Sequence, residues 1–257
     1  MSQVTAIIVA RMGSTRLPRK SMMPLMGKPM VERLIERVSR ASAVDKIVLA
    51  TTELPNDDPL ARLAGDLDIS CFRGASEDVL KRLYDTTLWS GGDPVLQILG
   101  DNPLLPSELI DDVVNFYMCN ELDYAASATT EFPSLGVDIA KFPIGVRVEV
   151  ISASAMEKCN YMAQDPESRE HSLSWVYTHP EDFKVGYFPA DGPWANVARP
   201  ELTFAVNYKE NMDLVVQLFD LCYSVNPNFP LSTVIEAIDA HPELKPLMGE
   251  PLQAIDV

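Results

Sequence analysis

A basic loop near the N-terminus is the segment of this sequence best suited to chemistry. It spans residues 10–20, A-R-M-G-S-T-R-L-P-R-K, and its cations are Arg11, Arg16, Arg19 and Lys20. Arginine forks bind pairs of oxygen atoms, Gly13 lets the backbone approach a ligand closely, and the Ser14 hydroxyl can donate a hydrogen bond. The pattern matches neither GxxxxGK[ST] nor GxGxxG. The loop predicts a site for an anionic small molecule such as a polyphosphate, with a solvated basic loop as the alternative.

The basic loop stands out because the chain as a whole is acidic. With 37 Asp and Glu residues against 21 Lys and Arg, the 257-residue chain has a formal net charge of -16 at pH 7. Nucleic acids are bound through many basic side chains, so we expect no nucleic-acid partner. The four cysteines form no CxxC pair, and the sequence shows neither a bilayer-length apolar run nor a signal peptide. We therefore expect a cytoplasmic protein with reduced cysteines and no membrane partner.

Short apolar runs alternate with helical patterns in the first half of the chain. The expected strands cover residues 4–10, 46–51, 69–72 and 95–99. This alternation predicts an α/β fold with a mostly parallel, Rossmann-like sheet and helices on both faces. Ligands of such sheets bind beyond the carboxyl ends of the strands, so the basic loop should share one rim with the segments that follow the other strands. In the helix expected over 30–41, Glu32, Arg33 and Arg37 should face water.

The pattern changes after about residue 130. Alternation over 145–151 places three valines on one face of a strand and Arg147 with Glu149 on the other. The later elements expected are helices over 153–162, 168–178, 212–222 and 231–240 and a strand over 202–206. We expect one domain over 1–257. Within it, about 130–200 should add an antiparallel edge and a lobe for the acceptor or for dimerisation, and 225–257 a C-terminal helix and tail.

The basic loop is the first of several motifs that follow one another along the chain. The others are G-K-P-M at 27–30, I-V-L-A-T-T at 47–52, F-R-G-A-S-E-D-V-L-K-R at 72–82, G-D-N-P-L at 100–104, P-I-G-V-R-V-E-V at 143–150, S-R-E-H at 168–171 and F-A-V-N-Y-K-E-N at 204–211. Together they resemble the cytidylyltransferases that make CMP-activated sugars, of the spore-coat polysaccharide biosynthesis type. The CMP-3-deoxy-manno-octulosonate and CMP-sialate synthetases are more distant. The resemblance implies a nucleotide-diphospho-sugar transferase-like fold.

A nucleotidyltransfer reaction is what this resemblance implies. An oxygen atom of the acceptor attacks the α-phosphate of CTP, pyrophosphate leaves and a CMP conjugate forms, while the protein positions the reactants and neutralises phosphate charge. The residues implied for catalysis are Arg11, Arg16, Lys20 and Asp101. The residues implied for nucleotide binding are Ala10, Arg11, Gly13, Ser14, Lys20, Thr51, Thr52, Arg73 and Gly100, with Thr51, Thr52 and Arg73 as candidates for the cytidine pocket.

A magnesium site is implied at Asp101, whose carboxylate could bridge through the ion to phosphate oxygens. The alternative is that Asp101 only closes a turn before Pro103. Where the related proteins carry an aspartate as second ligand, this chain has Asn207, whose amide oxygen can coordinate Mg²⁺ without adding negative charge. Mg²⁺ is the expected cofactor, with Asp101 and Asn207 as its candidate ligands.

A second departure from the related pattern lies at Arg147, where the motif G-L-D-V-E has an aspartate. With Asn207 it makes the acceptor side more positive and predicts a small anionic acceptor, either a sugar acid or a phosphonate or phosphate compound. The alternative is drift, with Arg147 paired to Glu149. The candidate acceptor-binding residues are Arg147, Glu149, Arg169 and His171, and His171 could instead be a hydrogen-bonded structural histidine.

Two further alternatives stay open at this point. Another nucleoside triphosphate, or a phosphate-bearing acceptor, would change the substrate without changing the fold. A non-catalytic nucleotide-binding regulator would fit the missing metal carboxylate at Asn207, although such a module need not keep the basic loop, Arg73 and Asp101. The expected partners are CTP and the acceptor, in a homodimer by likeness to the family.

Overall fold

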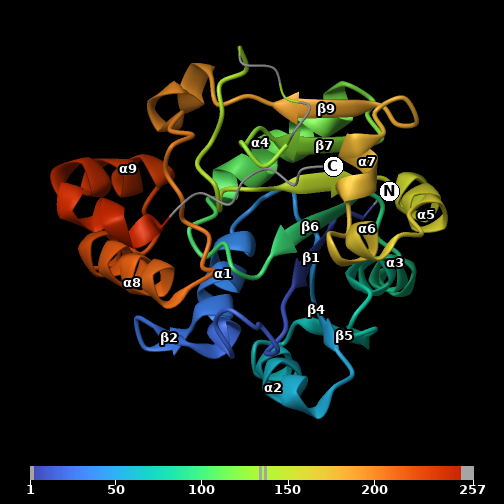
Figure 1. The fold of residues 1–257 in the computed structure, drawn as a ribbon, viewed down its shortest axis with the longest axis horizontal. Helices are drawn as coiled ribbons and strands as arrows, with labels where there is room; N and C mark the ends of the chain where they lie inside the picture. Colours follow the sequence, from blue (N-terminus) through green and yellow to red (C-terminus); the bar gives the residue numbers. More distant parts are fainter. Residues whose placement is uncertain (1–2, 133–134, 136–137, 250–257) are drawn as a thin grey trace.

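A seven-stranded sheet forms the centre of the computed structural model, which describes residues 3–132, 135 and 138–249. Its order is β5-β4-β1-β6-β8-β7-β9 (Figure 1). The strands are β1 (Thr5–Val9), β4 (Lys46–Thr52), β5 (Ser70–Gly74), β6 (Val95–Leu99), β7 (Tyr124–Ser127), β8 (Glu149–Ile151) and β9 (Val185–Phe188). β4 and β6 pair parallel to β1, β5 to β4 and β9 to β7, whereas β8 is antiparallel to both of its neighbours. The predicted mostly parallel α/β fold is confirmed.

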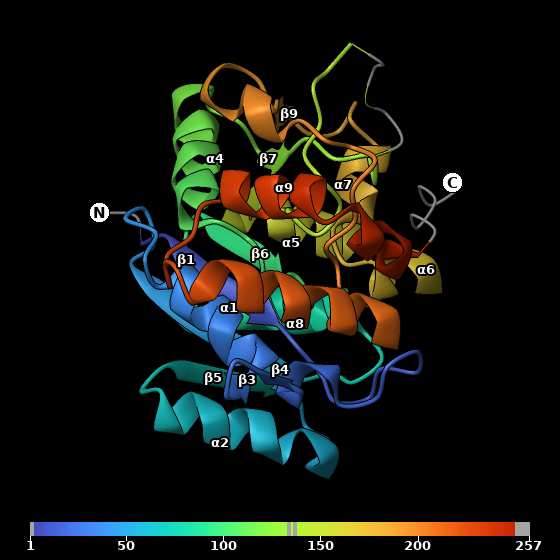
Figure 2. The ribbon, with the colours of Figure 1, turned by 90° about the vertical axis from the view of Figure 1, so that its left-hand side faces the viewer.

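Helices cover both faces of the sheet, and the alternation of side chains along β1 separates two cores. Ala6 and Ile8 point into one core, and Ile7 points into the other. The first core packs against α1 (Met30–Val38), α2 (Asp58–Asp66), α4 (Ser107–Cys119), α8 (Lys209–Tyr223) and α9 (Leu231–Ala240). The second packs against α3 (Val79–Ser90), α5 (Ala153–Met162) and α7 (Ser174–Thr178). Figure 2 looks onto the first helical layer, with α1, α8 and α9 in front of the sheet.

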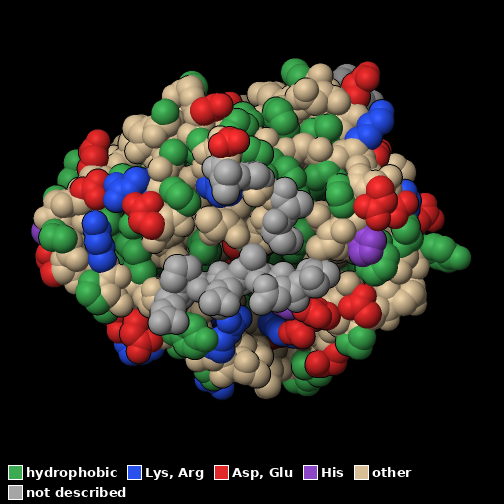
Figure 3. All heavy atoms as spheres, turned by 45° about the horizontal axis from the view of Figure 1, so that its top comes forward, with side chains coloured by type: hydrophobic (Ala, Val, Ile, Leu, Met, Phe, Trp, Pro, Cys, Tyr) green, Lys and Arg blue, Asp and Glu red, His purple; other side chains and the backbone are tan. Residues whose placement is uncertain are grey.

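The remaining elements are short. They are the β2–β3 ribbon (Pro24–Leu25 and Lys28–Pro29), α6 (Pro166–Glu170) and 3-10 helices at Lys20–Met22, Pro55–Asp57, Gly192–Val197 and Pro242–Met248. The end of the predicted tail, 250–257, lies outside the described residues. No helix in the described ranges is long and apolar enough to cross a membrane. On the face shown in Figure 3, acidic side chains are spread among apolar and polar ones rather than gathered in one patch.

The predicted strand over 202–206 is wrong. This segment makes a single bridge, between Thr203 and Ile144, and then runs past the end of β6, where the Val206 N–H donates to the Asp101 carbonyl at 2.9 Å. The antiparallel edge is also misplaced, because β8 is antiparallel but lies inside the sheet and β9 forms the edge. The segment therefore serves to close the rim beside Asp101 rather than to extend the sheet.

Glu32, Arg33 and Arg37 of α1 are buried, contrary to the prediction from helical periodicity. The Arg33 Nε donates to the Leu25 carbonyl at 3.1 Å, and the Arg37 Nε donates to the Leu105 carbonyl at 2.8 Å. Both guanidinium groups also lie 4.6 Å from an aromatic ring centre. A long side chain can thus satisfy its donors on carbonyls of distant loops, which a local pattern does not reveal.

Gly145 holds the 202–206 segment against the loop that precedes β8. Its φ is 86°, and a Cβ there would lie 2.3 Å from the Ala205 nitrogen. Backbone strain and steric overlap should make Gly145→Ala lower the free energy of unfolding by roughly 2–4 kcal/mol, as measured by chemical denaturation. Gly65→Ala in α2 is the matched control, because its Cβ would meet nothing within 4 Å. Equal stability of the two variants would contradict this account.

Candidate active site

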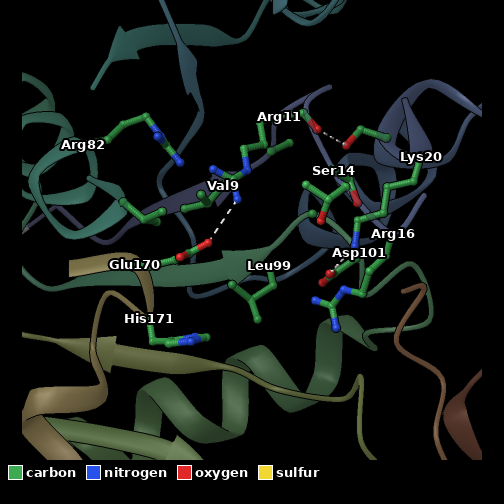
Figure 4. Close-up of a pocket in the computed structure, with 15 residues that line it drawn as sticks. Val9, Arg11, Ser14, Arg16, Lys20, Arg82, Leu99, Asp101, Glu170 and His171 are labelled. Atoms are coloured by element: carbon green, nitrogen blue, oxygen red, sulfur yellow. Dashed lines mark hydrogen bonds and ion pairs between the residues drawn. The ribbon is translucent and has the colours of Figure 1, made fainter. Parts of the chain in front are cut away.

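Two adjoining cavities lie at the carboxyl ends of the strands. The first has a volume of about 270 Å³ and lies between the basic loop, the ends of β1 and β6, and α3 (Figure 4). The second has a volume of about 230 Å³ and lies between the end of β6, β8 and the turn from α6 to α7. Arg16, Leu99, Asp101, Glu170 and His171 line both. The rim predicted from the parallel sheet is therefore where charged side chains converge.

Lys20 and Asp101 join the basic loop to the end of β6. The Lys20 Nζ donates to the Asp101 Oδ2 and to the Val206 carbonyl, both at 2.7 Å. The two side chains are only 13% and 21% exposed. Figure 4 shows Arg16 on the other side of Asp101, and its guanidinium lies 5.8 Å from the Tyr208 ring centre. Asp101 thus sits between two cations at the junction of the cavities.

A buried carboxylate supports the basic loop from beneath. Asp57 accepts the Met12 N–H at 2.7 Å and the Thr52 N–H at 3.2 Å, and the Thr52 hydroxyl donates to it as well. Within the loop, the Arg19 N–H donates to the Met12 carbonyl at 3.0 Å, and the Ser14 Oγ accepts the Leu17 N–H at 3.3 Å. The shape of the loop is therefore fixed by its own backbone and by Asp57.

The structure brings only some of the residues predicted for nucleotide binding and catalysis together. Those in the wall of the first cavity are Ala10, Arg11, Ser14, Arg16, Lys20, Gly100 and Asp101. Gly13 is exposed outside that wall, and Thr51 and Thr52 are buried beneath it. Arg73 pairs with Asp58 at 2.7 Å and donates to the Thr52 carbonyl at 2.9 Å, so it braces the turn after β4 instead. Thr52 supports the loop only through Asp57. Gly13, Thr51, Thr52 and Arg73 therefore lie outside the wall of the first cavity.

Arg82 in α3 is a cavity residue that the sequence prediction missed. It is 1% exposed and lines the first cavity with Arg11. Its Nη1 donates to the Ala75 and Ser76 carbonyls, while its buried Nε has no hydrogen-bond partner among the described residues. Burial, with the Arg11 charge nearby, lowers the pKa of Arg82 to about 10. Such a desolvated cation suits a ligand rich in hydrogen-bond acceptors, and an arginine on the buried face of a helix was its signal in the sequence.

Arg147 lies in the wall of the second cavity, and its charge is already paired. Its terminal nitrogens lie 2.9 Å from a Glu149 oxygen and 3.5 Å from a Glu131 oxygen. Its guanidinium also lies 4.5 Å from the Phe132 ring centre and 5.6 Å from that of Tyr177. Burial acts to lower the pKa of Arg147, but the two carboxylates outweigh burial and hold that pKa above its usual value. The pair with Glu149, which the sequence analysis gave as the alternative, is present in the structure, and Glu131 shares the same guanidinium group.

A turn brings His171 to both cavities. The predicted helix over 168–178 is instead two short helices, because Ser172 takes a φ of 26° and its hydroxyl exchanges hydrogen bonds of 2.7 and 3.0 Å with the Gln97 side chain. The His171 ring makes no hydrogen bond to another residue that the structure describes, although it lines both cavities. The alternative, a structural histidine held by hydrogen bonds, therefore has no partner residue in the described part of the chain. His171 is placed where it could meet an acceptor.

Arg169, the neighbouring candidate, points away from the cavities. It pairs with Asp78 at 2.8 Å and donates to the carbonyls of Asn160 at 2.9 Å and Ala163 at 3.1 Å. Asp78 is also the N-cap of α3. Arg169 therefore ties α3 to α5 and α6, and the structure does not bring it to the acceptor side.

The residues at the junction of the cavities fit a magnesium ion. Asp101 and Asn207 both line the second cavity and offer hard oxygen donors. Among the described residues no group of three or more His, Cys, Asp or Glu side chains could hold a metal. This fits an ion that binds one or two protein ligands and takes the rest from phosphates and water, as Mg²⁺ does in nucleotide sites.

The match between this chain and known proteins assigns it to a family. Residues 5–190 match the family described as cytidylyltransferase. The chain belongs to the cytidylyltransferase family. It is therefore an enzyme, which removes the non-catalytic regulator as an alternative. A spore coat polysaccharide biosynthesis protein of Bacillus subtilis is 25% identical over 248 residues, which cover 95% of this chain and 97% of that protein.

Solved structures share the cytidylyltransferase fold. A cytidylyltransferase from Leptospira borgpetersenii aligns with a TM-score of 0.85 and 24% identity, over 98% of this chain and 99% of that one. A CMP:2-keto-3-deoxy-manno-octonic acid synthetase, solved with CTP, aligns with a TM-score of 0.62 and 17% identity, over 85% of this chain and 99% of that one. The resemblance inferred from the motifs is confirmed.

Proposed function

We propose that this cytidylyltransferase transfers CMP from CTP to a hydroxyl group of a sugar-type acceptor and releases pyrophosphate, with Mg²⁺ as cofactor. The observation that carries the proposal is the Lys20–Asp101 pair, which stands between the basic loop and the end of β6 where the two cavities meet. The phosphates would occupy the first cavity and the acceptor the second. The related spore coat polysaccharide protein supports an acceptor that is a glycan precursor.

The transfer step exchanges one P–O bond for another. The acceptor oxygen bonds to the α-phosphorus, the bond from that phosphorus to the bridging oxygen breaks, and pyrophosphate leaves with the bonding electron pair. Arg11, Arg16 and Lys20 would stabilise the charge that builds up on the phosphates. His171, which lines both cavities, would accept the proton of the hydroxyl group. A magnesium ion held by Asp101 and Asn207 would neutralise phosphate charge.

The first cavity has two distinct ends, which suggests how CTP would lie. In Figure 4 Lys20, Arg16 and Asp101 lie at one end and Arg82 at the other, with Leu99 between them. With the triphosphate beside the basic loop, the cytosine would extend toward Arg82. A guanidinium only donates hydrogen bonds, so it fits the O2 and N3 acceptors of cytosine and disfavours uracil, whose N3 carries a hydrogen.

Pyrophosphate release with each of the four nucleoside triphosphates, with and without Mg²⁺, tests the proposed function. A panel of acidic, neutral and amino sugars serves as acceptors. We expect CTP to be used at least about tenfold faster than the others, and only with a divalent ion present. Equal rates with all four nucleotides, or a rate that is unchanged when Mg²⁺ is left out, would contradict the proposal. The homodimer stays a prediction, which sedimentation of the purified protein would check.

Arg82→Met is expected to reduce the preference for CTP over UTP, expressed as the ratio of kcat/KM values, by about tenfold. The substitution keeps an extended side chain but removes the donors that would face the base. Loss of packing alone would slow both nucleotides equally and leave the ratio unchanged, which would count against base recognition by Arg82. Arg62→Met is the matched control, because Arg62 is an exposed arginine of α2.

A further inference from the structure

Asn211, in the first turn of α8, is a buried residue whose side chain uses every hydrogen-bonding group it has. It is 4% exposed. Its Oδ1 accepts the backbone N–H groups of Asn207 at 3.1 Å and of Tyr208 at 2.9 Å. Its Nδ2 donates to the carbonyls of Leu247 at 3.2 Å and of Met248 at 2.9 Å. Because N–H groups face the oxygen and carbonyls face the nitrogen, the side chain can satisfy all of them in one orientation only.

The backbone turn that Asn211 holds closes the junction of the two cavities. Just before it, the Val206 N–H donates to the Asp101 carbonyl at 2.9 Å, and the Val206 carbonyl accepts from the Lys20 Nζ at 2.7 Å. The next residue, Asn207, lines the second cavity, and its side chain makes no hydrogen bond to another described residue. The backbone of the turn therefore sets the position of this candidate metal ligand.

The Tyr208 ring links the same turn to the basic loop. It lies 5.8 Å from the Arg16 guanidinium, within the range of a cation–π contact. Arg16 lines both cavities and makes no hydrogen bond or ion pair to another residue that the structure describes. Figure 4 shows its guanidinium beside Asp101. The position of Tyr208 therefore limits where Arg16 can lie at the junction.

We propose that Asn211 is a positioning residue for CMP transfer: it holds the turn 206–208 so that Asn207 faces the metal and Tyr208 restrains Arg16. The inference rests on the proposed function, because it takes the junction of the cavities as the place of the metal and the phosphates. Asn211 lines neither cavity, so it acts through the turn alone. Residues that orient a metal ligand in this way typically change metal affinity or activity by about 10–100-fold when they are replaced.

Amide hydrogen exchange of the full-length protein, without nucleotide or metal, tests whether Asn211 holds the turn. Asn211→Leu keeps the approximate size of the side chain but loses all of its hydrogen bonds, whereas Asn211→Asp loses only the donors to Leu247 and Met248. We expect the Asn207 and Tyr208 amides to exchange at least about tenfold faster in Asn211→Leu, and within about threefold of wild type in Asn211→Asp. Unchanged protection in β1 would show that both variants fold. Wild-type exchange at the turn in Asn211→Leu would overturn the proposal.

Steady-state kinetics show whether the turn matters for the reaction. The kcat/KM for CTP should fall by about 10–100-fold in Asn211→Leu, with a higher Mg²⁺ concentration for half-saturation, and stay within about threefold of wild type in Asn211→Asp. Both variants lose the bonds to the C-terminal 3-10 helix, so equal kinetics of the two would overturn the proposal. Asn115→Leu on the exposed face of α4 is the matched control and should keep wild-type kinetics. If the wild type released no pyrophosphate from CTP, the proposed function itself would fail, whereas the exchange data would still decide whether Asn211 holds the turn.

Tyr208→Phe and Tyr208→Leu test the contact with Arg16 at an exposed position, where neither change should prevent folding. Phenylalanine keeps the ring, so wild-type kinetics are expected. Leucine removes the ring, and the KM for CTP should rise by about two- to fivefold, the size of an exposed cation–π contact. Equal KM values for the two variants would overturn the part of the proposal that concerns Arg16.

Discussion

Asp101→Asn is expected to slow CMP transfer by about 10³-fold, the largest loss that any single substitution in the site should cause. Asparagine keeps the shape of the side chain but removes the charge that faces Lys20 at 2.7 Å and that would bind Mg²⁺. Steady-state pyrophosphate release should also need a higher Mg²⁺ concentration for half-saturation. A shift in the metal requirement distinguishes a lost ligand from a general loss of structure.

The matched control for this charge removal is Asp66→Asn, an exposed aspartate at the end of α2. It should leave both the rate and the Mg²⁺ dependence at wild-type values. If Asp101→Asn kept its rate within about threefold of wild type at saturating Mg²⁺, the result would indicate that Asp101 only closes the turn before Pro103.

Lys20→Met should lower kcat/KM for CTP by about 10²–10³-fold. Methionine has nearly the same length but cannot donate, so Asp101 and the Val206 carbonyl both lose a partner at 2.7 Å. The ammonium group would also no longer neutralise phosphate charge. Steady-state kinetics at saturating acceptor measure this effect, and the KM of the acceptor should change far less than that of CTP.

Lys184→Met provides the corresponding control, because Lys184 is exposed just before β9 and outside both cavities. Lys20→Arg keeps the positive charge with a larger head group, so we expect it to recover part of the lost activity. Equal kinetics of Lys20→Met and Lys184→Met would show that Lys20 does not act on the nucleotide.

Most of the sheet could be predicted because its signal is local. Continuous apolar runs such as 4–10 and 95–99 mark buried parallel strands, and strand–helix alternation then fixes which ends meet. Because parallel strands share one rim at their carboxyl ends, Lys20 and Asp101 are expected close together, although 81 positions separate them. The strand predicted over 202–206 failed because apolar residues in a rim-closing segment look the same in sequence as a strand.

The acceptor side could not be predicted in the same way, since its contacts depend on distant loops. Glu131 neutralises part of the Arg147 charge from a loop 16 positions away, and no periodic pattern in the sequence predicts this contact. The break at Ser172 depends on its pairing with Gln97 from β6, 75 positions earlier. Arg82 is easily overlooked because an arginine in a helix is usually solvated. Its helical spacing with Thr86 and Ser90 nevertheless places it on the buried face of α3, against the first cavity.

A crystal structure with Mg²⁺ and a non-hydrolysable CTP analogue would show directly whether the basic loop and Asp101 hold the nucleotide and its metal. We expect the triphosphate in the first cavity within hydrogen-bond distance of Arg11, Arg16 and Lys20, with the metal bound to an Asp101 oxygen. A triphosphate bound away from the basic loop, or a metal that leaves Asp101 uncoordinated, would contradict it.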